Sequence, residues 1–259
     1  MPFFTPGDDP GANFPDLLRR VGLATDTTAA GNATFDVPHA TTCVALRYAD
    51  GVVMAGDRRA TSGNLISHRT MEKVVQADRH SGVAIAGAAG PAMEMVRLFQ
   101  LQLEHYEKVE GSSISLEGKA NQLSMMVRSN LPAAMQGMVV VPIFAGYDER
   151  RGVGRLWDYD PTGGRYEERD YVATGSGSLH AGTVIKVGYR SDFDRSAAIE
   201  LVARALWEAA DADSATGGPD PLRGIYPTVA TIDVEGWMQV DDDDLAVRYE
   251  TIAAEVRAR

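Results

Sequence analysis

Residues 41–60 read TTCVALRYADGVVMAGDRRA, two short apolar runs joined by a turn. The runs Cys43 to Leu46 and Val52 to Ala55 lie on either side of Asp50-Gly51. This arrangement is typical of a β-hairpin, because aspartate and glycine accept the backbone angles of a tight turn. The stretch therefore predicts the first two strands of a sheet.

The residues before this hairpin differ in composition from those after it. Residues 1–40 are dominated by Pro, Gly, Asp, Asn, Thr and Ala. They hold one short amphipathic patch, made of Phe14, Leu17, Leu18 and Val21. No basic stretch followed by an apolar run is present, so a secretory signal is not indicated. We predict a detachable leader over residues 1–40 and a folded domain over residues 41–259.

Apolar periodicity after the hairpin predicts strands and helices in alternating blocks. Strands are expected at 73–76, 83–87, 138–147, 154–159, 166–174, 228–234 and 237–240. Helices are expected over 91–106 and 116–131, from 179 onward, over 197–210, and from 241 to the C-terminus. Blocks of this kind favour an α+β domain with its helices on the faces of sheets.

Charge and composition exclude several classes of partner. The chain carries 25 Lys and Arg against 36 Asp and Glu, a formal net charge of −11. Binding to nucleic acid needs clustered cations, so neither nucleic acid nor an anionic membrane is an expected partner. The longest nearly apolar run, residues 138–147, is far shorter than the roughly 20 residues of a membrane span. A single cysteine, Cys43, suits a reducing compartment.

Common cofactor and metal motifs are missing from the sequence. Gly118-Lys119 is followed by Ala120, which excludes a P-loop, and residues 175–178 read GSGS, which is neither a nucleophile elbow nor a dinucleotide fingerprint. The five histidines, His39, His68, His80, His105 and His180, lack ligand spacing. Asp241 to Asp244 is interpreted as the capped first turn of the last helix, where negative charge suits the helix dipole, rather than as a metal site. No cofactor or metal is expected.

The junction between leader and domain carries a threonine that would become reactive as a chain terminus. His39-Ala40 precedes Thr41-Thr42, so removal of the leader would make a threonine the first residue. Such a threonine carries both a hydroxyl nucleophile and an α-amine that serves as its base. The amine has a reference pKa of roughly 7.7 to 8.0, which a nearby lysine lowers toward neutral pH. A threonine can equally begin a strand for its β propensity, and these residues alone leave both readings open.

A wider set of motifs identifies a family. It comprises Thr41-Thr42, Gly56-Asp57-Arg58-Arg59-Ala60-Thr61, Lys73, Ile85-Ala86-Gly87, Gly175-Ser176-Gly177-Ser178 and Asp213-Ser214-Ala215-Thr216-Gly217-Gly218. Together these segments resemble the β-subunits of 20S proteasomes, particularly actinobacterial ones, along the whole chain from Thr41. In that family the catalytic Asp, Lys and oxyanion Gly follow the threonine at fixed offsets. Those offsets fit when counted from Thr41, giving Asp57, Lys73 and Gly87, and fail from Thr42.

The resemblance implies a four-layer αββα sandwich of the N-terminal-nucleophile hydrolase type and a threonine-type endopeptidase. Its cleavage site lies between Ala40 and Thr41, and Thr41 is the nucleophile. In the family, Lys73 would keep Thr41 in a reactive protonation state and Asp57 would position Lys73. The backbone N–H of Gly87 would donate a hydrogen bond to the oxyanion that forms at the scissile carbonyl. Further residues orient the terminal amine and its water: Ser176, Asp213 and Thr216.

The resemblance also implies a substrate cleft. The backbones of Thr61 and Ala89 pair with an extended peptide. The first specificity pocket is formed by Ala60, Met71, Val75, Ile85, Ala89 and Met93. None of these side chains is charged, so cleavage is expected mainly after apolar residues.

The family further implies an assembly. Stacked seven-membered rings, twenty-eight subunits in all, contain this chain beside other β-subunits and partner α-subunits in the cytoplasm. An AAA-type ATPase ring feeds in unfolded proteins or proteins tagged with a ubiquitin-like modifier. Three alternatives are kept: a non-catalytic or unprocessed scaffold subunit, a subunit of the related hexameric two-component bacterial peptidase, and a plain binding module.

The chain departs from the family pattern at three positions. Ala40 stands where glycine is common, and its Cβ restricts the turn from which Thr41 attacks, so self-cleavage is expected to be slower. Thr216 replaces a frequent serine and keeps the hydroxyl. Cys43 replaces an aliphatic residue, and we interpret it as packing rather than as a nucleophile.

Overall fold

The computed structural model describes residues 41–258, which lie within the compact unit Asp36–Arg259. Ala40, His39 and the apolar leader patch therefore lie outside the described residues, and the domain boundary at residue 40 stays a prediction. The strands are β1 (Thr42–Tyr48), β2 (Gly51–Gly56), β3 (Ala60–Ser62), β4 (Leu65–His68), β5 (Val74–Asp78), β6 (Ser81–Gly87), β7 (Val140–Asp148), β8 (Val153–Tyr159), β9 (Arg165–Glu168), β10 (Tyr171–Gly175), β11 (Thr228–Asp233) and β12 (Gly236–Gln239). The helices are α2 (Ala89–Glu110), α3 (Leu116–Ser129), α4 (Leu131–Ala134), α5 (Ser178–Gly188), α6 (Arg195–Ala212) and α7 (Asp242–Arg257).

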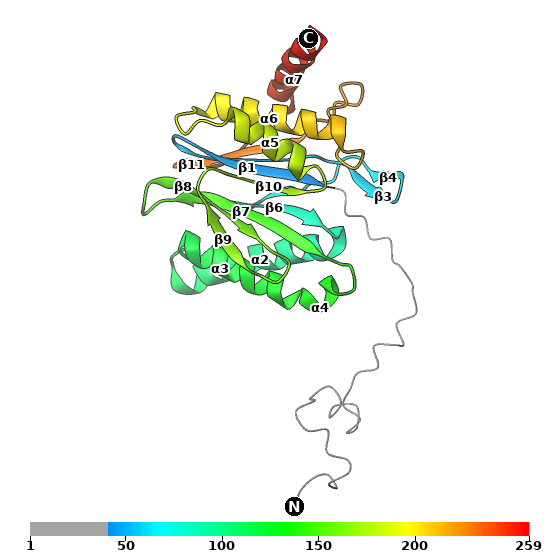
Figure 1. Ribbon diagram of the computed structural model, residues 1–259. Helices are drawn as coiled ribbons and strands as arrows, with labels where there is room; N and C mark the ends of the chain where they lie inside the picture. The colour runs from blue at the N-terminus through cyan, green and yellow to red at the C-terminus, as the bar shows by residue number, and fades with distance from the viewer. Residues whose placement is uncertain (1–40, 259) are drawn as a thin grey trace, which may run out of the picture. The chain divides into compact units, whose positions relative to one another are not determined.

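Two five-stranded antiparallel sheets lie face to face between two helical layers (Figure 1). One sheet has the order β10-β1-β2-β11-β12, and its outer face is covered by α5 and α6. The other has the order β5-β6-β7-β8-β9, and its outer face is covered by α2 and α3. The last helix, α7, packs on α6. This is the four-layer αββα sandwich that the family resemblance implies, and the α+β class that apolar periodicity predicts.

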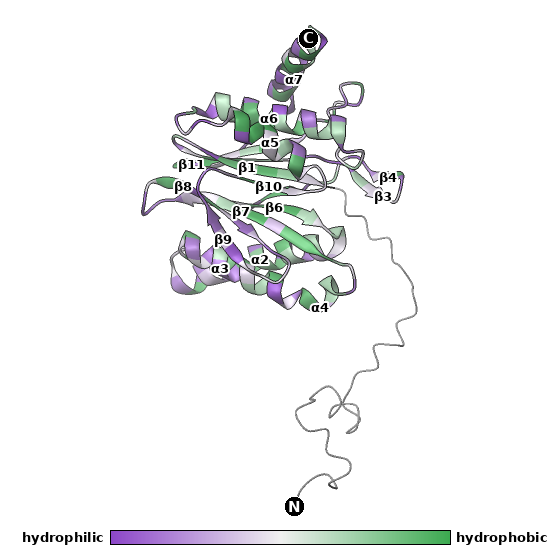
Figure 2. Ribbon diagram, viewed as in Figure 1, coloured by the Kyte–Doolittle hydropathy of each residue, from purple (hydrophilic) through white to green (hydrophobic). Residues whose placement is uncertain are grey.

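The central strands are apolar on both faces, because each face meets another layer. In β1, Val44 and Leu46 belong to the core beneath α5 and α6, whereas Cys43 and Ala45 belong to the core between the sheets. Figure 2 shows this as continuous hydrophobic colour along β1 and β7, in contrast to the hydrophilic edge strand β9. Strand alternation therefore sends neighbouring residues of β1 into two different cores.

Within residues 41–258, two helices, α3 and α6, begin with a side chain that caps the helix. Asp194 accepts a hydrogen bond from the Ala197 N–H at the start of α6. The expected capping at the last helix is wrong in detail, because the Asp241 side chain accepts no capping hydrogen bond, although three aspartates fill the first turn of α7. Their charge still suits the positive end of the helix. In the described part of the chain, no helix combines the length and apolarity that a membrane span requires.

The single strand expected at 166–174 is wrong. Residues 165–168 form β9 at the edge of one sheet, and residues 171–175 form β10 at the edge of the other. The break is held by Arg47, whose backbone N–H donates to the Asp170 carbonyl and whose guanidinium donates to the Arg169 carbonyl. A long-range contact thus divides a segment that looks continuous in sequence. The short hairpin of β3 and β4 and the one-turn helix α4 were not predicted.

Candidate active site

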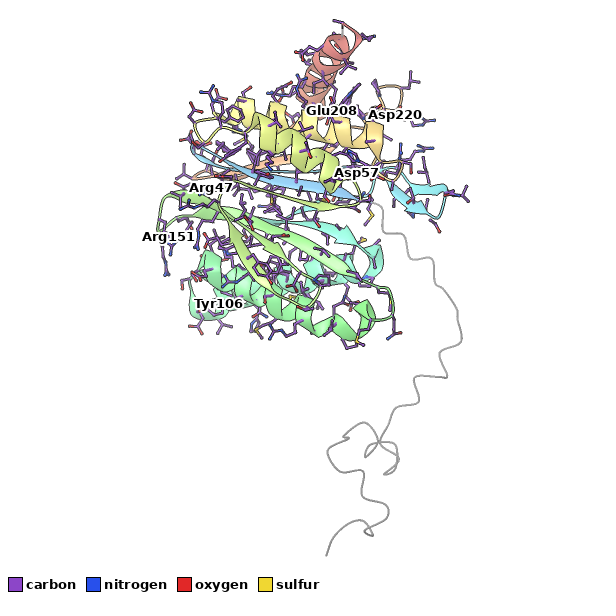
Figure 3. The ribbon with its side chains drawn as sticks, viewed as in Figure 1. Arg47, Asp57, Tyr106, Arg151, Glu208 and Asp220 are labelled. Carbon is purple, nitrogen blue, oxygen red and sulfur yellow. The ribbon has the colours of Figure 1, made fainter. Side chains whose placement is uncertain are left out.

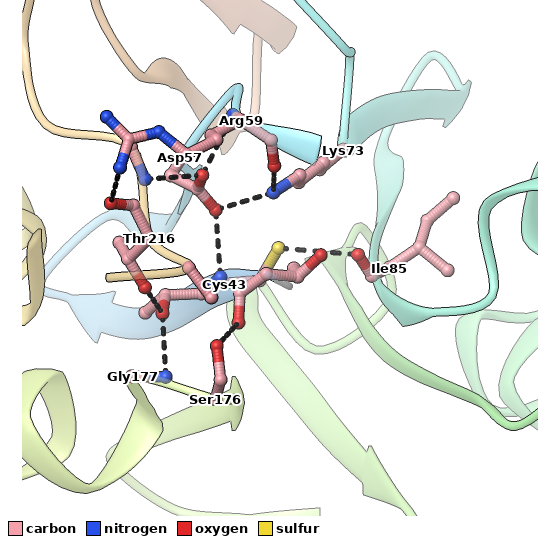
Figure 4. A network of polar contacts seen from close by, with 12 residues as sticks. Cys43, Asp57, Arg59, Lys73, Ile85, Ser176, Gly177 and Thr216 are labelled. Atoms are coloured by element: carbon pink, nitrogen blue, oxygen red, sulfur yellow. Dashed lines mark hydrogen bonds and ion pairs between the residues drawn. The ribbon is translucent and has the colours of Figure 1, made fainter. Parts of the chain in front are cut away.

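The centre of the site is a buried ion pair between Asp57, just after β2, and Lys73, just before β5. Lys73 Nζ lies 2.7 Å from Asp57 Oδ1, and the two side chains are 1% and 0% exposed. The same oxygen accepts the backbone N–H of Thr42 at 2.8 Å. Lys73 also donates to the carbonyl of Arg59 (Figure 4). One carboxylate oxygen therefore joins the lysine to the peptide unit that follows Thr41.

Backbone donors hold the Asp57 carboxylate from three segments. Asp57 Oδ2 accepts the N–H groups of Arg59 and Gly217, each at 2.9 Å. The Asp57 N–H donates in turn to the Thr42 carbonyl at 3.1 Å. A buried ion pair is costly unless its remaining lone pairs are satisfied, and here both carboxylate oxygens have backbone partners. The pair is thus placed by its surroundings and does not rest on mutual attraction alone.

Thr41 lies directly before β1 and is 4% exposed. Its carbonyl accepts the backbone N–H of Ser176 at 2.8 Å, and the Ser176 hydroxyl oxygen lies 3.3 Å from it. Gly175, at the end of β10, has a φ of +98°, and a Cβ there would lie 1.9 Å from the Thr41 carbonyl oxygen. Only glycine fits this approach, so Gly175 is required for β10 to run beside Thr41.

A second hydrogen-bonded chain runs along the opposite face of β1. The N–H of Gly177, at the start of α5, donates to Thr42 Oγ1 at 3.0 Å. Thr42 Oγ1 lies 2.5 Å from Thr216 Oγ1, and Thr216 donates to Asp213 Oδ2 at 2.6 Å. Because the hydrogen of Thr216 is committed to the carboxylate, Thr42 must donate to Thr216. The chain consequently has one direction, from Gly177 to Asp213.

One carboxylate oxygen of Asp213 accepts hydrogen bonds from two hydroxyl groups. Ser176 Oγ also lies 2.6 Å from Asp213 Oδ2. Burial raises the pKa of the Asp213 carboxyl, but hydrogen bonds from Ser176 and Thr216 outweigh this effect, so the pKa lies below its ordinary value. Asp213 is therefore ionised at neutral pH. The three residues that the resemblance assigns to amine orientation, Ser176, Asp213 and Thr216, are brought together beside Thr41.

Cys43 is placed on the face of β1 that meets the second sheet. Its side chain is fully buried, and Sγ donates to the Ile85 carbonyl at 3.6 Å. Burial raises the pKa of the thiol to about 12, although the Lys73 charge lowers it. The nucleophilic form of cysteine is the thiolate, which is negligible at neutral pH with such a pKa. These facts support the interpretation of Cys43 as a packing residue.

Gly87 ends β6 with a φ of +114°, and a Cβ there would meet the Val139 carbonyl oxygen at 2.1 Å. This position requires glycine, whatever its part in chemistry. The expected pocket residues come from β3, β5, β6 and the first turns of α2, and from the loop between β4 and β5. Ala60 and Ile85 are buried, whereas the Met93 side chain is 60% exposed. The roles of all these residues stay predictions.

Two residues that bear on the site, Thr42 and Arg59, were given no role from the sequence. Arg59 donates through Nη1 to the carbonyls of Ser214, at 3.0 Å, and Thr216, at 3.2 Å. Its own backbone contacts Asp57 and Lys73. Both residues stood inside the motifs that carry the resemblance. Their contacts with residues 214–216 span 155 or more positions, so no local sequence pattern indicates these contacts.

Comparison with known proteins places these features in context. A family model described as proteasome subunit matches residues 37–220. The chain is 57% identical over 257 residues to a protein named proteasome subunit beta from Acidimicrobium ferrooxidans, covering 99% of this chain and 93% of that protein. It is 51% identical over 264 residues to a protein of the same name from Acidothermus cellulolyticus, covering 98% and 89%. A Streptomyces griseus protein of that name is 57% identical over 209 residues, covering 81% and 74%.

Proposed function

This chain belongs to the proteasome subunit family, as a β-subunit of the 20S core, and on that basis we propose that it is a catalytic subunit, a threonine endopeptidase with Thr41 as nucleophile. Membership of the family makes it part of a protease of the proteasome type, assembled in rings with other proteasome subunits. The catalytic state and the self-cleavage are the proposal.

The observation that carries the proposal is the shared oxygen of Asp57. Asp57 Oδ1 accepts both the Lys73 ammonium and the Thr42 N–H, so the lysine is tied to the peptide unit next to Thr41. A threonine that acts through its own α-amine needs a fixed positive charge near that amine, which disfavours the protonated form. This arrangement supplies such a charge, with the burial that makes it effective.

The first step of the proposed mechanism is self-cleavage. Thr41 Oγ attacks the carbonyl carbon of Ala40, and the Oγ proton passes to the departing nitrogen of Thr41 as the C–N bond breaks. The resulting ester between residue 40 and Thr41 Oγ is hydrolysed by water. Residues 1–40 leave with a free carboxylate, and Thr41 gains its α-amine.

The mature site then repeats this chemistry on a substrate peptide. The α-amine takes the Oγ proton while Oγ bonds to the scissile carbonyl carbon, and it returns the proton to the leaving amine. The backbone N–H of Gly87 donates to the oxyanion, a contact of a kind typically worth about 2.7 to 4 kcal/mol in catalysis. Water hydrolyses the acyl ester and restores the hydroxyl. The charged network around Asp213 orients the amine and the attacking water.

Substrate choice and context complete the proposal. The uncharged residues around Ala60, Ile85 and Met93 favour cleavage after apolar residues. Unfolded or tagged proteins enter through an α-ring served by an ATPase ring, in the cytoplasm. A panel of peptides differing only before the scissile bond tests the preference, and faster cleavage after basic or acidic residues would contradict it.

The deciding experiment is the intact mass of the chain after co-assembly with its α-subunits. We expect the parent to lose the mass of residues 1–40 and the Thr41→Ala variant to retain it. Thr251→Ala makes the same chemical change on the exposed side of α7 and serves as the matched control, which should mature like the parent. Thr41→Ser keeps a hydroxyl and should mature as well.

Two results would count against the proposal. A full-length mass in the parent and in both controls would identify an unprocessed scaffold subunit. Processing of Thr41→Ala at the same bond would show that another protease removes the leader, so that Thr41 is not the nucleophile of maturation.

A further inference from the structure

Arg59 contacts two separate parts of the candidate active site, one through its backbone and one through its side chain. Its N–H donates to Asp57 Oδ2 at 2.9 Å, and its carbonyl accepts a hydrogen bond from Lys73. Its guanidinium lies against the loop after α6, where Nη1 donates to the Ser214 carbonyl at 3.0 Å and to the Thr216 carbonyl at 3.2 Å (Figure 4). The side chain thus spans 155 and 157 positions of the sequence.

Residues 213–217, called loop 213–217 below, have internal hydrogen bonds that shape the loop. The N–H of Thr216 donates to the Asp213 carbonyl at 3.0 Å, and the N–H of Ala215 donates to Asp213 Oδ1 at 3.2 Å. These bonds set the conformation of the loop but not its distance from the Asp57–Lys73 pair. A planar guanidinium with fixed donor directions can set that distance, because its two acceptors must keep their places relative to the arginine.

Gly217 shows how closely loop 213–217 approaches Arg59. A Cβ on Gly217 would lie 2.7 Å from Arg59 Cβ and 3.2 Å from the Arg59 backbone nitrogen. The Gly217 N–H also donates to Asp57 Oδ2 at 2.9 Å. The loop backbone is therefore in direct contact with Arg59, and the missing side chain of glycine permits this approach.

We infer that Arg59 is a positioning residue of the endopeptidase, whose guanidinium holds the loop carrying Asp213 in place relative to the Asp57–Lys73 pair. In the proposed mechanism, the network around Asp213 orients the Thr41 amine and the attacking water. A displaced loop would slow these chemical steps, since a misplacement of about 1 Å can cost about 10²-fold in rate. The catalytic consequence rests on the proposed function, whereas the holding of the loop can be tested without it.

Arg47 supplies a matched control. Its Nη1 donates to a backbone carbonyl at 3.1 Å, that of Arg169, and so makes the same kind of contact with a loop. Arg47 lies near the end of β1 that is remote from Thr41, and Figure 3 labels Arg47 and Asp57 at opposite ends of the sheets. Replacing Arg47 should loosen structure without affecting the active site.

The first measurement is amide hydrogen exchange by mass spectrometry, on particles assembled from the full chain and its α-subunits. Arg59→Gln removes the guanidinium and leaves the backbone contacts with Asp57 and Lys73. We expect peptides that cover loop 213–217 to exchange about ten-fold faster in this variant than in the parent, because a hydrogen-bonded anchor is lost. In Arg47→Gln, exchange in this loop should equal that of the parent.

Gly217→Ala tests the same contact from the loop side, with Arg59 intact. The added Cβ would push the loop away from Arg59, so faster exchange of the loop is expected here as well. Its control is Gly182→Ala in α5, where the new Cβ would lie an ordinary 3.6 Å from the Ala173 Cβ. Exchange in loop 213–217 should be unchanged in that control.

The second measurement is peptide hydrolysis per matured subunit, with maturation determined from the intact mass. We expect kcat to fall about 10- to 100-fold in Arg59→Gln and Gly217→Ala, with KM within about two-fold of the parent. Arg59→Lys keeps the charge on a shorter side chain and should fall between the parent and Arg59→Gln. Arg47→Gln should keep the parental kcat. A residue that only stabilised the fold would lower the number of active particles and leave kcat per matured subunit unchanged.

Two results would overturn the inference. Unchanged exchange of loop 213–217 in Arg59→Gln would show that the guanidinium does not hold the loop, and faster exchange with a parental kcat would show that catalysis does not depend on it. If Arg59→Gln does not assemble, Arg59→Lys and Gly217→Ala decide by the same two measurements. A parent that keeps its leader and cleaves no peptide would instead overturn the proposed function, and the exchange result would still decide whether Arg59 holds the loop.

Discussion

Two lysine–aspartate pairs are largely buried in the described part of the chain, and they differ in what surrounds the carboxylate. Lys73 and Asp57 are 2.7 Å apart and 1% and 0% exposed. Lys119 and Asp78 are 2.5 Å apart and 6% and 19% exposed. By distance and burial alone, the two pairs are close to equivalent. Neither property therefore distinguishes a candidate catalytic pair from a structural one.

The difference lies in the other partners of each aspartate. Asp78 accepts the Ser81 hydroxyl and the His80 N–H, both within three residues, and so stabilises the turn between β5 and β6. Asp57 accepts N–H groups from Thr42, Arg59 and Gly217, and Gly217 is 160 positions away. A carboxylate that accepts hydrogen bonds from segments far apart in the chain can hold reacting groups of those segments in place. A carboxylate with only local partners stabilises its own turn.

The largest expected effect comes from removing each lysine. Lys73→Met leaves the fully buried Asp57 carboxylate without its cation, a change that typically costs about 3–5 kcal/mol of stability, and Lys119→Met, which leaves the partly exposed Asp78, should cost less. Only Lys73→Met should also lower peptidase activity per assembled particle, by about 10²- to 10⁴-fold, the usual range for a lost acid–base contribution. Thermal unfolding and peptide hydrolysis measure the two effects. Equal loss of activity in both variants would remove the distinction between the pairs.

A smaller effect is expected from the chain on the other face of β1. Thr42→Val removes the hydroxyl that accepts from Gly177 and donates to Thr216, and leaving such buried partners unsatisfied costs about 1–3 kcal/mol. Thr42→Ser should restore stability and leader removal. The control is Thr231→Val in β11, where a fully buried hydroxyl makes only one long contact, 3.5 Å to the Met238 carbonyl. A Thr231→Val loss as large as that of Thr42→Val would mean that β-strand threonines are generically sensitive.

The ionised state of Asp213 predicts a pH dependence. Its folded-state pKa lies below the ordinary value of about 3.9, so the carboxylate stabilises the fold fully above that value, and the stabilisation is lost as pH falls through the lowered pKa. We expect Asp213→Asn to unfold at a lower temperature than the parent at pH 6, with the two midpoints converging as the pH drops below about 4. If the difference between the two unfolding midpoints persisted at low pH, the destabilisation would come from the changed shape of the side chain and not from the lost charge.

No effect on activity is expected at Cys43. A thiol with a pKa raised to about 12 and no exposure should not react with a thiol reagent at pH 8 until the chain unfolds. Cys43→Ala should mature and hydrolyse peptides like the parent, with a modest loss of stability from the smaller side chain. If the Cys43→Ala variant failed to remove its leader, the Cys43 thiol would have to be considered a reacting group.

Much of the fold was predictable because its signals are local. The hairpin of β1 and β2, the pair α2 and α3, and the long helix α6 each follow from apolar periodicity within the segment itself. The division of residues 165–175 between two sheets was not predictable, because the break depends on Arg47 in β1 reaching the carbonyls of Arg169 and Asp170. The β3–β4 hairpin was missed for a related reason, since β4 is exposed throughout and carries no burial pattern.

The amino-acid order of this subunit is sufficient to single out Thr41, Asp57 and Lys73 as candidate catalytic residues, because their spacing is a property of the chain and the family pattern depends on that spacing. It also determines which face of β1 each residue occupies, since alternation along a strand is local. The direction of the chain from Gly177 through Thr42 and Thr216 to Asp213 depends on the folded structure. That chain joins segments more than 130 positions apart, whose approach is set by how the two sheets and α5 and α6 pack.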